Sequence, residues 1–431
     1  MRPRVSCLVV VSALALGLPS VALGQESQLA ALRGNAGAPA GQLSLGRALR
    51  RAGRFDEAVR ALNSAARSPA TRADAQWELA RVRFDQADFR AANAACRALP
   101  NGVRKRVCAA RAYVIWQRAA LAQRELQAAG PAASGDGEYA LVMGDVQRLA
   151  SQTAQSEASY QRAAQLMPGR AEPFLGLGTL YEMLQRFDDA EAQYRRAAET
   201  DASDPAAALA YGRFLLRRRS NPAAARELLQ RATRDRLGWA EAQSLYGESL
   251  LGTASPAEAL TQFQEAVRLS ATQPGAQTGL GRALVALQRW AEAEAPLREG
   301  IRQVGTDAQA HMALADVMEH TQRESEALEM WDAAIDRAPA NALARLRAAQ
   351  LAHRTQQSTM ALAYLERALQ LDPNLAEAFF LQGQIAAETG RREDARAAFQ
   401  RALGLNAPGL DRAEVERALQ ALDQPRPNRR R

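Results

Sequence analysis

The sequence predicts an all-α protein, a solenoid of about eleven helical hairpins with a capping helix at its C-terminal end. Alanine dominates the apolar residues and aromatic residues make up only 5% of the chain. Alanine is the strongest helix former, and its small side chain lets neighbouring helices approach closely. A small residue also recurs at nearly constant spacing, and prolines punctuate the chain between the expected helices. Self-similarity of this kind is typical of stacked structural repeats.

The repeat is clearest between Pro173 and Asp201. There Gly178 is followed by an alanine after twelve residues, a bulky residue after sixteen and a second alanine after nineteen. The small-residue column recurs in steps of 34 residues, once 35 and once 64, at Gly46, Ala80, Gly144, Gly178, Gly212, Gly247, Gly281, Ala315, Ala349 and Gly383. The long step indicates an irregular unit at about 101–137. Prolines fall between units, where a helix has to end, at Pro168, Pro205, Pro274, Pro339 and Pro373.

This pattern resembles the tetratricopeptide repeat (TPR) family over roughly residues 39–408. The resemblance implies a right-handed superhelix of two-helix units, in which the small residue of the first helix lets the two backbones meet closely. A single hairpin cannot bury its apolar face alone, so we expect residues 39–424 to form one stack. Residues 410–422 are expected to cap its open end.

The N-terminal residues are typical of a secretory signal peptide. Arg2 and Arg4 precede an apolar run from Val5 to about Leu18, and small residues close the segment before Gln25. About fourteen apolar residues are too few for a transmembrane anchor, which needs roughly twenty. We therefore expect residues 1–24 to be a cleaved signal peptide and residues 25–38 to be a flexible segment. The mature protein is expected to be exported to the periplasm or cell envelope of a bacterium, with no transmembrane segment.

Two cysteines, Cys96 and Cys108, remain after the expected cleavage. An even pair in an oxidising compartment is a candidate disulfide, and the alternative is two buried thiols. The resemblance places Cys96 on the second helix of one unit and Cys108 on the first helix of the irregular unit. Since such helices pack together in this family, the disulfide is the favoured interpretation.

The net charge of +8 does not indicate a nucleic-acid partner. Arg2 and Arg4 belong to the expected signal peptide, and four more arginines lie in a C-terminal tail, 425–431, that is expected to be disordered. The folded body is therefore close to neutral and has no basic groove for nucleic acid. The tail itself could make a weak contact with an anionic surface.

No pattern for catalysis, a cofactor or a metal is present. His311, His320 and His353 are the three histidines, and none has the spacing of a metal site. The Gly-x-Gly of Gly176 and Gly178 lies inside an expected helix and follows no strand, so it is a packing feature rather than a phosphate loop. The sequence predicts a protein that is not an enzyme.

The concave face is where the TPR resemblance places a ligand. The residue after each small-column position should point into it, and an apolar row should lie four residues before that inward-pointing residue. The expected partner-binding residues are Arg47, Trp77, Arg81, Asp145, Thr179, Arg213, Arg217, Glu248, Arg282, Met312, Asp316, Gln350 and Phe380. Two interpretations remain open: an internal ladder of ion pairs between stacked helices, or a mixed groove for an amphipathic or extended peptide. The asparagine and lysine clamp that the family uses for acidic C-terminal tails is missing from these columns.

The sequence therefore favours an exported, non-catalytic scaffold that binds a protein or peptide of the envelope, of secretion or of surface assembly. The alternative is an accessory protein for export or assembly of a polysaccharide or other polymer. Scarce aromatic residues in the expected groove argue against that alternative.

Overall fold

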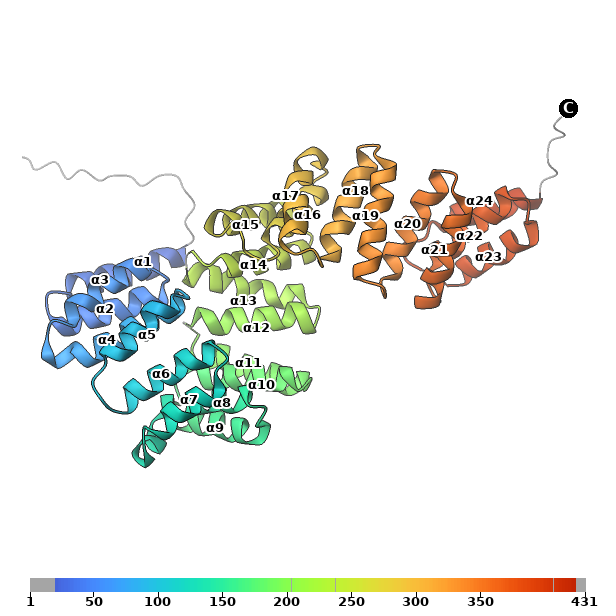
Figure 1. Cartoon of the computed structure of the whole chain (residues 1–431). Coiled ribbons are helices and arrows are strands. Elements are labelled where there is room, and N and C mark those ends of the chain that lie inside the picture. Colours follow the sequence, from blue (N-terminus) through green and yellow to red (C-terminus); the bar gives the residue numbers. More distant parts are fainter. Residues whose placement is uncertain (1–19, 203, 237, 406, 424–431) are drawn as a thin grey trace, which may run out of the picture. The chain divides into compact units, whose positions relative to one another are not determined.

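The computed structural model describes residues 20–423 except 203, 237 and 406, and every regular element in that range is a helix (Figure 1). Helices α2 to α23 form eleven consecutive hairpins, as the repeat predicts, with α1 before them and α24 after them. By their internal contacts the residues fall into two compact units, 1–242 and 243–431, with the boundary inside α14.

The first unit contains α1 (Ser20–Gly34), α2 (Pro39–Arg51), α3 (Phe55–Ala65), α4 (Pro69–Asp85), α5 (Phe89–Ala98), α6 (Val103–Ile115), α7 (Ala119–Gln127), a 3-10 helix (Pro131–Gly135), α8 (Gly137–Leu149), α9 (Thr153–Leu166), α10 (Glu172–Met183), α11 (Phe187–Thr200), α12 (Pro205–Arg218), α13 (Pro222–Asp235) and the start of α14 (Ala240–Gly252). The second unit continues with α15 (Pro256–Leu269), α16 (Ala276–Ala286), α17 (Trp290–Gln303), α18 (Ala308–His320), α19 (Glu324–Arg337), α20 (Ala342–Arg354), α21 (Ser358–Leu371), α22 (Ala376–Glu388), α23 (Arg392–Gly404) and α24 (Arg412–Asp423).

Each hairpin is held by the small-residue column. A Cβ atom added at Gly178 on α10 would lie 2.8 Å from the ring of Tyr194 on α11, and one added at Gly383 would lie 2.5 Å from the ring of Phe399. Real Cβ atoms do not approach other atoms so closely, so glycine lets the bulky side chain of the second helix rest directly on the first helix. The predicted role of this column is confirmed.

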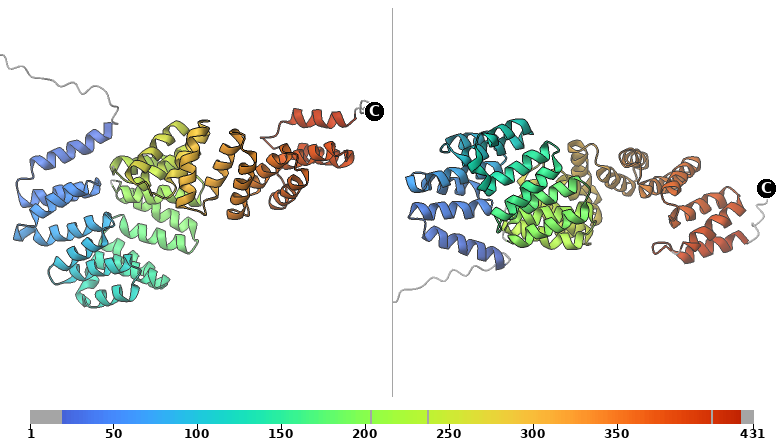
Figure 2. Two further views of the ribbon diagram at one scale, coloured as in Figure 1. Left: turned by 45° about the horizontal axis from the view of Figure 1, so that its top comes forward. Right: turned by 90° about the horizontal axis from the view of Figure 1, so that it is seen from below.

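The turn between the two helices of a hairpin also repeats. It contains one residue with positive φ, for example Gly53 (72°) after α2 and Gln322 (61°) after α18. That left-handed conformation reverses the chain in three to four residues, so the second helix packs antiparallel to the first (Figure 2).

Helix α1 corrects the prediction of a flexible segment at 25–38. It continues to Gly34, and Leu29, only 2% exposed, packs into the core made by α2 and α3, with Leu32 beside it. The three-residue spacing of these leucines puts both on one helical face, and burying that face stabilises the helix. Residues 1–19 and the tail 425–431 lie outside the described residues, and so do the predictions made for them.

The irregular unit is a short hairpin, α6 and α7, followed by the 3-10 helix. The predicted disulfide is present: Cys96 on α5 and Cys108 on α6 are joined, with their Cα atoms 5.4 Å apart. Both sulfur-bearing side chains are buried in a core that includes Val107 and Leu126. The bridge thus ties the irregular hairpin to the preceding regular one.

At the other end, α24 covers the last hairpin, as predicted for a capping helix. Its Val415 is fully buried and packs in the same core as Phe399 and Ala402 of α23. Among the described helices, none combines the length and the apolar character needed to cross a membrane.

Candidate partner-binding cavity

The helices of the first unit curve until α1 contacts α13 (Figures 1 and 2). Arg236, which follows α13, completes this closure. Its guanidinium lies 5.0 Å above the ring of Phe55 and 4.2 Å above the ring of Trp239, and it donates a hydrogen bond of 3.4 Å to the backbone carbonyl of Asp85. Residues some 150 positions apart in the sequence therefore meet at the rim of one open-sided hollow.

That space is a cavity of about 880 Å³. Most of its lining lies on the first helices of successive hairpins, from α2 to the start of α12, and Tyr160 of α9, Arg236 and residues of the connecting segments complete it. Its volume lies in the range of cavities that bind ligands. The apolar part of the lining includes Trp77, Phe84, Leu141 and Leu175. The charged part comprises Arg47, Arg50, Arg51, Asp74, Glu78, Arg81, Asp85, Arg104, Arg111, Asp136, Glu138, Asp145, Arg148, Arg170, Glu172, Asp201, Asp204 and Arg236. Arginines and carboxylates are equal in number, so the cavity is formally neutral but strongly polar.

Glu78 on α4 is the most buried of these charges, with only 4% of its surface exposed. Its carboxylate lies 3.2 Å from the guanidinium of Arg47, 3.3 Å from that of Arg50 and 3.7 Å from that of Arg81. Arg50 also binds Asp85 at 2.7 Å. A buried carboxylate must be paired, and here three arginines from two helices share that role.

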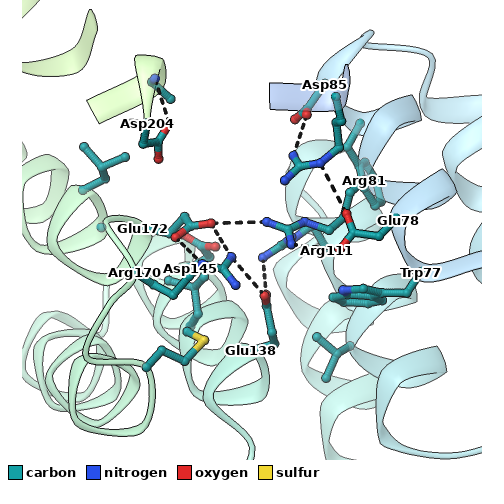
Figure 3. Close-up of a pocket in the computed structure, with 18 of the residues that line it drawn as sticks. Trp77, Glu78, Arg81, Asp85, Arg111, Glu138, Asp145, Arg170, Glu172 and Asp204 are labelled. Atoms are coloured by element: carbon teal, nitrogen blue, oxygen red, sulfur yellow. Dashed lines mark hydrogen bonds and ion pairs between the residues drawn. The ribbon is translucent and has the colours of Figure 1, made fainter. Parts of the chain in front are cut away.

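A second set of pairs crosses the cavity (Figure 3). Arg81 on α4 reaches Glu172 on α10 at 3.3 Å, although 91 residues separate them in the sequence. Glu172 is also bound by Arg170, which in turn binds Glu138 at 3.3 Å, and Glu138 accepts a hydrogen bond of 3.0 Å from Arg111. The pairs form one continuous network over five helices. This part of the concave face therefore contains an ion-pair ladder and also encloses an open space.

The network sets the charge states of its members. Burial, together with the neighbouring charge of Arg50, lowers the pKa of Arg81 to about 10. Burial alone would raise the pKa of Glu172, but hydrogen bonds and charge from Arg170, with help from Arg81, lower it to about 2. The pKa of Glu138 is lowered in the same way by Arg111 and Arg81 against the effect of burial. All these groups are ionised at neutral pH.

Asp145 is held in a smaller cluster on α8. The hydroxyl of Tyr160 donates to its carboxylate at 2.8 Å, and Arg148 donates to the same hydroxyl at 3.2 Å. Burial, and then the charge of Asp145, raise the pKa of Tyr160, which keeps the hydroxyl protonated and able to donate.

Five of the expected site residues line the cavity: Arg47, Trp77, Arg81, Asp145 and Thr179. Arg213 and Arg217 lie on α12 but outside the lining, and Arg213 pairs with Glu241 at 3.1 Å. The other six belong to the second unit, on first helices of their hairpins, and line no part of this cavity: Glu248, Arg282, Met312, Asp316, Gln350 and Phe380. Their role as partner-binding residues stays a prediction.

The repeat columns in the sequence did not predict several charged residues that line the cavity. Arg50, Glu78 and Arg148 each lie three positions from an expected site residue, so one further helical turn would have included them. Glu138, Glu172 and Asp204 were missed because they lie at or next to the start of a first helix, where acidic residues also serve the helix terminus. Asp204 in front of Pro205 is a recognisable N-cap signal.

The second unit has a smaller hollow of about 330 Å³, lined by residues that include Phe379, Arg391 and Arg401. Asp316 lies on α18, the first helix of a hairpin in the second unit. Burial and then the nearby Glu319 raise the pKa of Asp316 to about 6.

Two of the three histidines contact neighbouring groups of the fold. The ring of His320 stacks on that of Trp290 with centroids 3.8 Å apart, and a ring nitrogen of His311 lies 2.8 Å from the carbonyl oxygen of Asp307. Within the described ranges no three His, Cys, Asp or Glu side chains are grouped so that they could hold a metal ion.

Comparison with known families assigns the fold. Two tetratricopeptide repeat models match the chain, one at residues 27–102, 141–206, 175–242, 215–276, 321–376 and 357–411, the other at 250–317. The chain therefore belongs to the tetratricopeptide repeat family, whose members generally mediate protein–protein interactions. The matches skip residues 103–140, which hold the irregular unit. No curated protein matches the chain.

Several solved structures are similar. A chain of the APC/C hetero-tetramer Cut9–Hcn1 is 12% identical, with a TM-score of 0.50 over 94% of this chain and 92% of that one. YrrB, described as a TPR protein with an unusual peptide-binding site, is 24% identical over 43% of this chain and 95% of its own, with a TM-score of 0.36. PilF of Pseudomonas aeruginosa is 18% identical over 50% of this chain and 99% of its own, with a TM-score of 0.44. At these identities the likeness shows the fold alone.

Proposed function

We propose that this protein is a non-catalytic scaffold that binds a protein or peptide segment in the cavity of its first unit. One observation carries the proposal: the curvature of α1–α13 encloses about 880 Å³ between first helices, the surface that bears the expected concave-face residues. Membership of a family of interaction modules supports it.

The chemistry of the lining favours a segment with both apolar and polar side chains. Trp77, Phe84 and Leu175 provide apolar contact area, while the fixed arginines and carboxylates provide directional partners of both signs. The ion pairs keep these charged groups in defined positions, so little side-chain freedom is lost when a segment binds.

We further propose that the protein is exported and that its partner belongs to the cell envelope. The signal-like residues 1–24 motivate this, and the Cys96–Cys108 disulfide supports it because such bonds persist in oxidising compartments. Fractionation of the tagged chain, with mass spectrometry of its N-terminus, tests this part. A protein that stays in the cytoplasm with residues 1–24 attached would contradict it.

Blocking the cavity tests the binding function. Thr179→Trp fills the cavity from α10, and Arg47→Trp does so from an exposed position on α2. The matched control is Glu227→Trp, at an exposed position of α13 outside the cavity lining. We expect proteins captured by the wild-type chain and by the control to be lost with both blocking variants, while circular dichroism stays unchanged. Equal capture by all four proteins would refute binding in the cavity.

A further inference from the structure

Asp204 differs from Glu78, Glu138 and Glu172, the other carboxylates withdrawn into the cavity wall. It lies at the N-cap of α12, where one oxygen, Oδ1, accepts a hydrogen bond of 2.9 Å from the backbone N–H of Ala206. Figure 3 shows its carboxylate pointing into the cavity, above Glu172 in that view and far from the network around Glu78. In the part of the chain that the structure describes, no arginine pairs with it.

The surroundings of Asp204 leave it short of positive charge. Glu78, Glu138 and Glu172 are each held by two or three arginines. For Asp204, by contrast, desolvation raises the pKa and the nearby carboxylates of Glu172 and Asp201 raise it further, while the hydrogen bond from Ala206 and the charge of Arg50 oppose this rise only in part. A partly buried carboxylate in that position gains free energy when a cation reaches it.

Arg236 lines the same cavity and feels the charge of Asp204, but the fold holds its guanidinium elsewhere. Its guanidinium lies over the rings of Phe55 and Trp239 and bonds to the backbone carbonyl of Asp85. It therefore serves the closure of the first unit and leaves the free oxygen of Asp204 facing the cavity.

We propose that the cavity receives a lysine or arginine side chain of the bound segment and that Asp204 is its partner. The inference rests on the proposed function and specifies its ligand. An acidic segment would have to compete with Glu78 or Glu172 for the arginines of the network, whereas a cationic side chain would find a partly buried carboxylate that none of the described arginines pairs with. A charge-assisted hydrogen bond in such a site is among the stronger polar contacts.

The test uses the full chain and three synthetic pentapeptides that differ only in their central residue: arginine, its neutral isostere citrulline, or glutamate. Binding is measured by fluorescence anisotropy. We expect the arginine peptide to bind about tenfold tighter than the citrulline peptide, and the glutamate peptide to bind most weakly.

Two variants locate the effect. Asp204→Asn removes the charge but keeps the oxygen that caps α12, since asparagine is as good an N-cap as aspartate. It should abolish the preference for arginine over citrulline. The matched control, Asp307→Asn, alters the N-cap of α18, which accepts from Gln309 and Ala310 outside this cavity, and should keep that preference.

The inference is overturned if the arginine and citrulline peptides bind alike, if the glutamate peptide binds best, if no peptide binds, or if Asp204→Asn leaves the preference intact. Those results would leave the proposed function standing as long as the cavity-blocking variants still fail to capture the partner. If the blocking variants capture the partner as well as the wild-type chain does, the proposed function itself is overturned.

Discussion

Gly383→Ala should destabilise the last hairpin, although alanine is the better helix former. The new Cβ atom would lie 2.5 Å from two ring carbons of Phe399, which is itself only 1% exposed and has no free space to move into. Overpacking of this kind costs about 1–3 kcal/mol. The gain in helix propensity offsets about 1 kcal/mol. We therefore expect a net loss of up to about 2 kcal/mol in the free energy of unfolding of this hairpin.

Gly404→Ala is the matched control in the same hairpin. Gly404 ends α23, and a Cβ atom added there would meet nothing within 4 Å. This variant should be neutral or slightly more stable than wild type. Repeat arrays can melt in parts, so native-state hydrogen exchange of the α22 and α23 amides, alongside urea unfolding, gives the local free energy. A Gly383→Ala protein as stable as Gly404→Ala would refute the close contact of Phe399 with α22.

Three further predictions concern the bridge and the buried charges. Reducing the Cys96–Cys108 disulfide should lower the free energy of unfolding by about 3 kcal/mol. Hydrogen exchange should locate the loss in α5–α7, and reductant should have no effect on a variant with alanine at both Cys96 and Cys108. Glu78→Gln should lower the free energy of unfolding in urea by about 3 kcal/mol, because it leaves its arginine partners without their carboxylate. The control, Glu57→Gln at a surface pair, should cost less than about 1 kcal/mol. Equal losses in the two variants would contradict the buried network. For Asp316 the folded pKa of about 6 lies above the unfolded value of about 3.8, so the folded state holds the proton more tightly and stability should fall as pH rises through that window. Asp316→Asn should lack that fall in unfolding measurements between those pH values, and an unchanged profile would show that Asp316 is not desolvated.

The helical hairpins could be predicted from the sequence because each one is a local unit. The spacing of Gly178 from Tyr194, and of Gly383 from Phe399, reports a contact between two helices joined by a short turn. The disulfide was predictable for the same reason, since Cys96 and Cys108 lie on helices that follow each other directly. Helix α1 was missed because Leu29 and Leu32 form only a short apolar face, whose burial depends on the core beneath it.

The cavity could be predicted only in part. The residue columns identified Arg47, Trp77 and Arg81 as facing inward, since they repeat with the hairpins. They could not show that Arg81 meets Glu172 or that Arg236 reaches Phe55. Those contacts depend on how strongly several successive hairpins, including the irregular one, curve together. The spacing of residues within one hairpin does not determine that curvature.

In-cell photocrosslinking tests the central claim, that the cavity of the first unit is the partner-binding site, most directly. A compact diazirine residue, small enough to leave the cavity open, is placed at Thr179 in the cavity, at the exposed Glu227 of α13 outside the lining, and at Arg282 and Gln350 on first helices of the second unit. The account predicts a discrete crosslinked protein from Thr179 and none from Glu227. The account would be contradicted if a partner is crosslinked only from Arg282 or Gln350 while the protein with the photoreactive residue at Thr179 is folded but gives no crosslink.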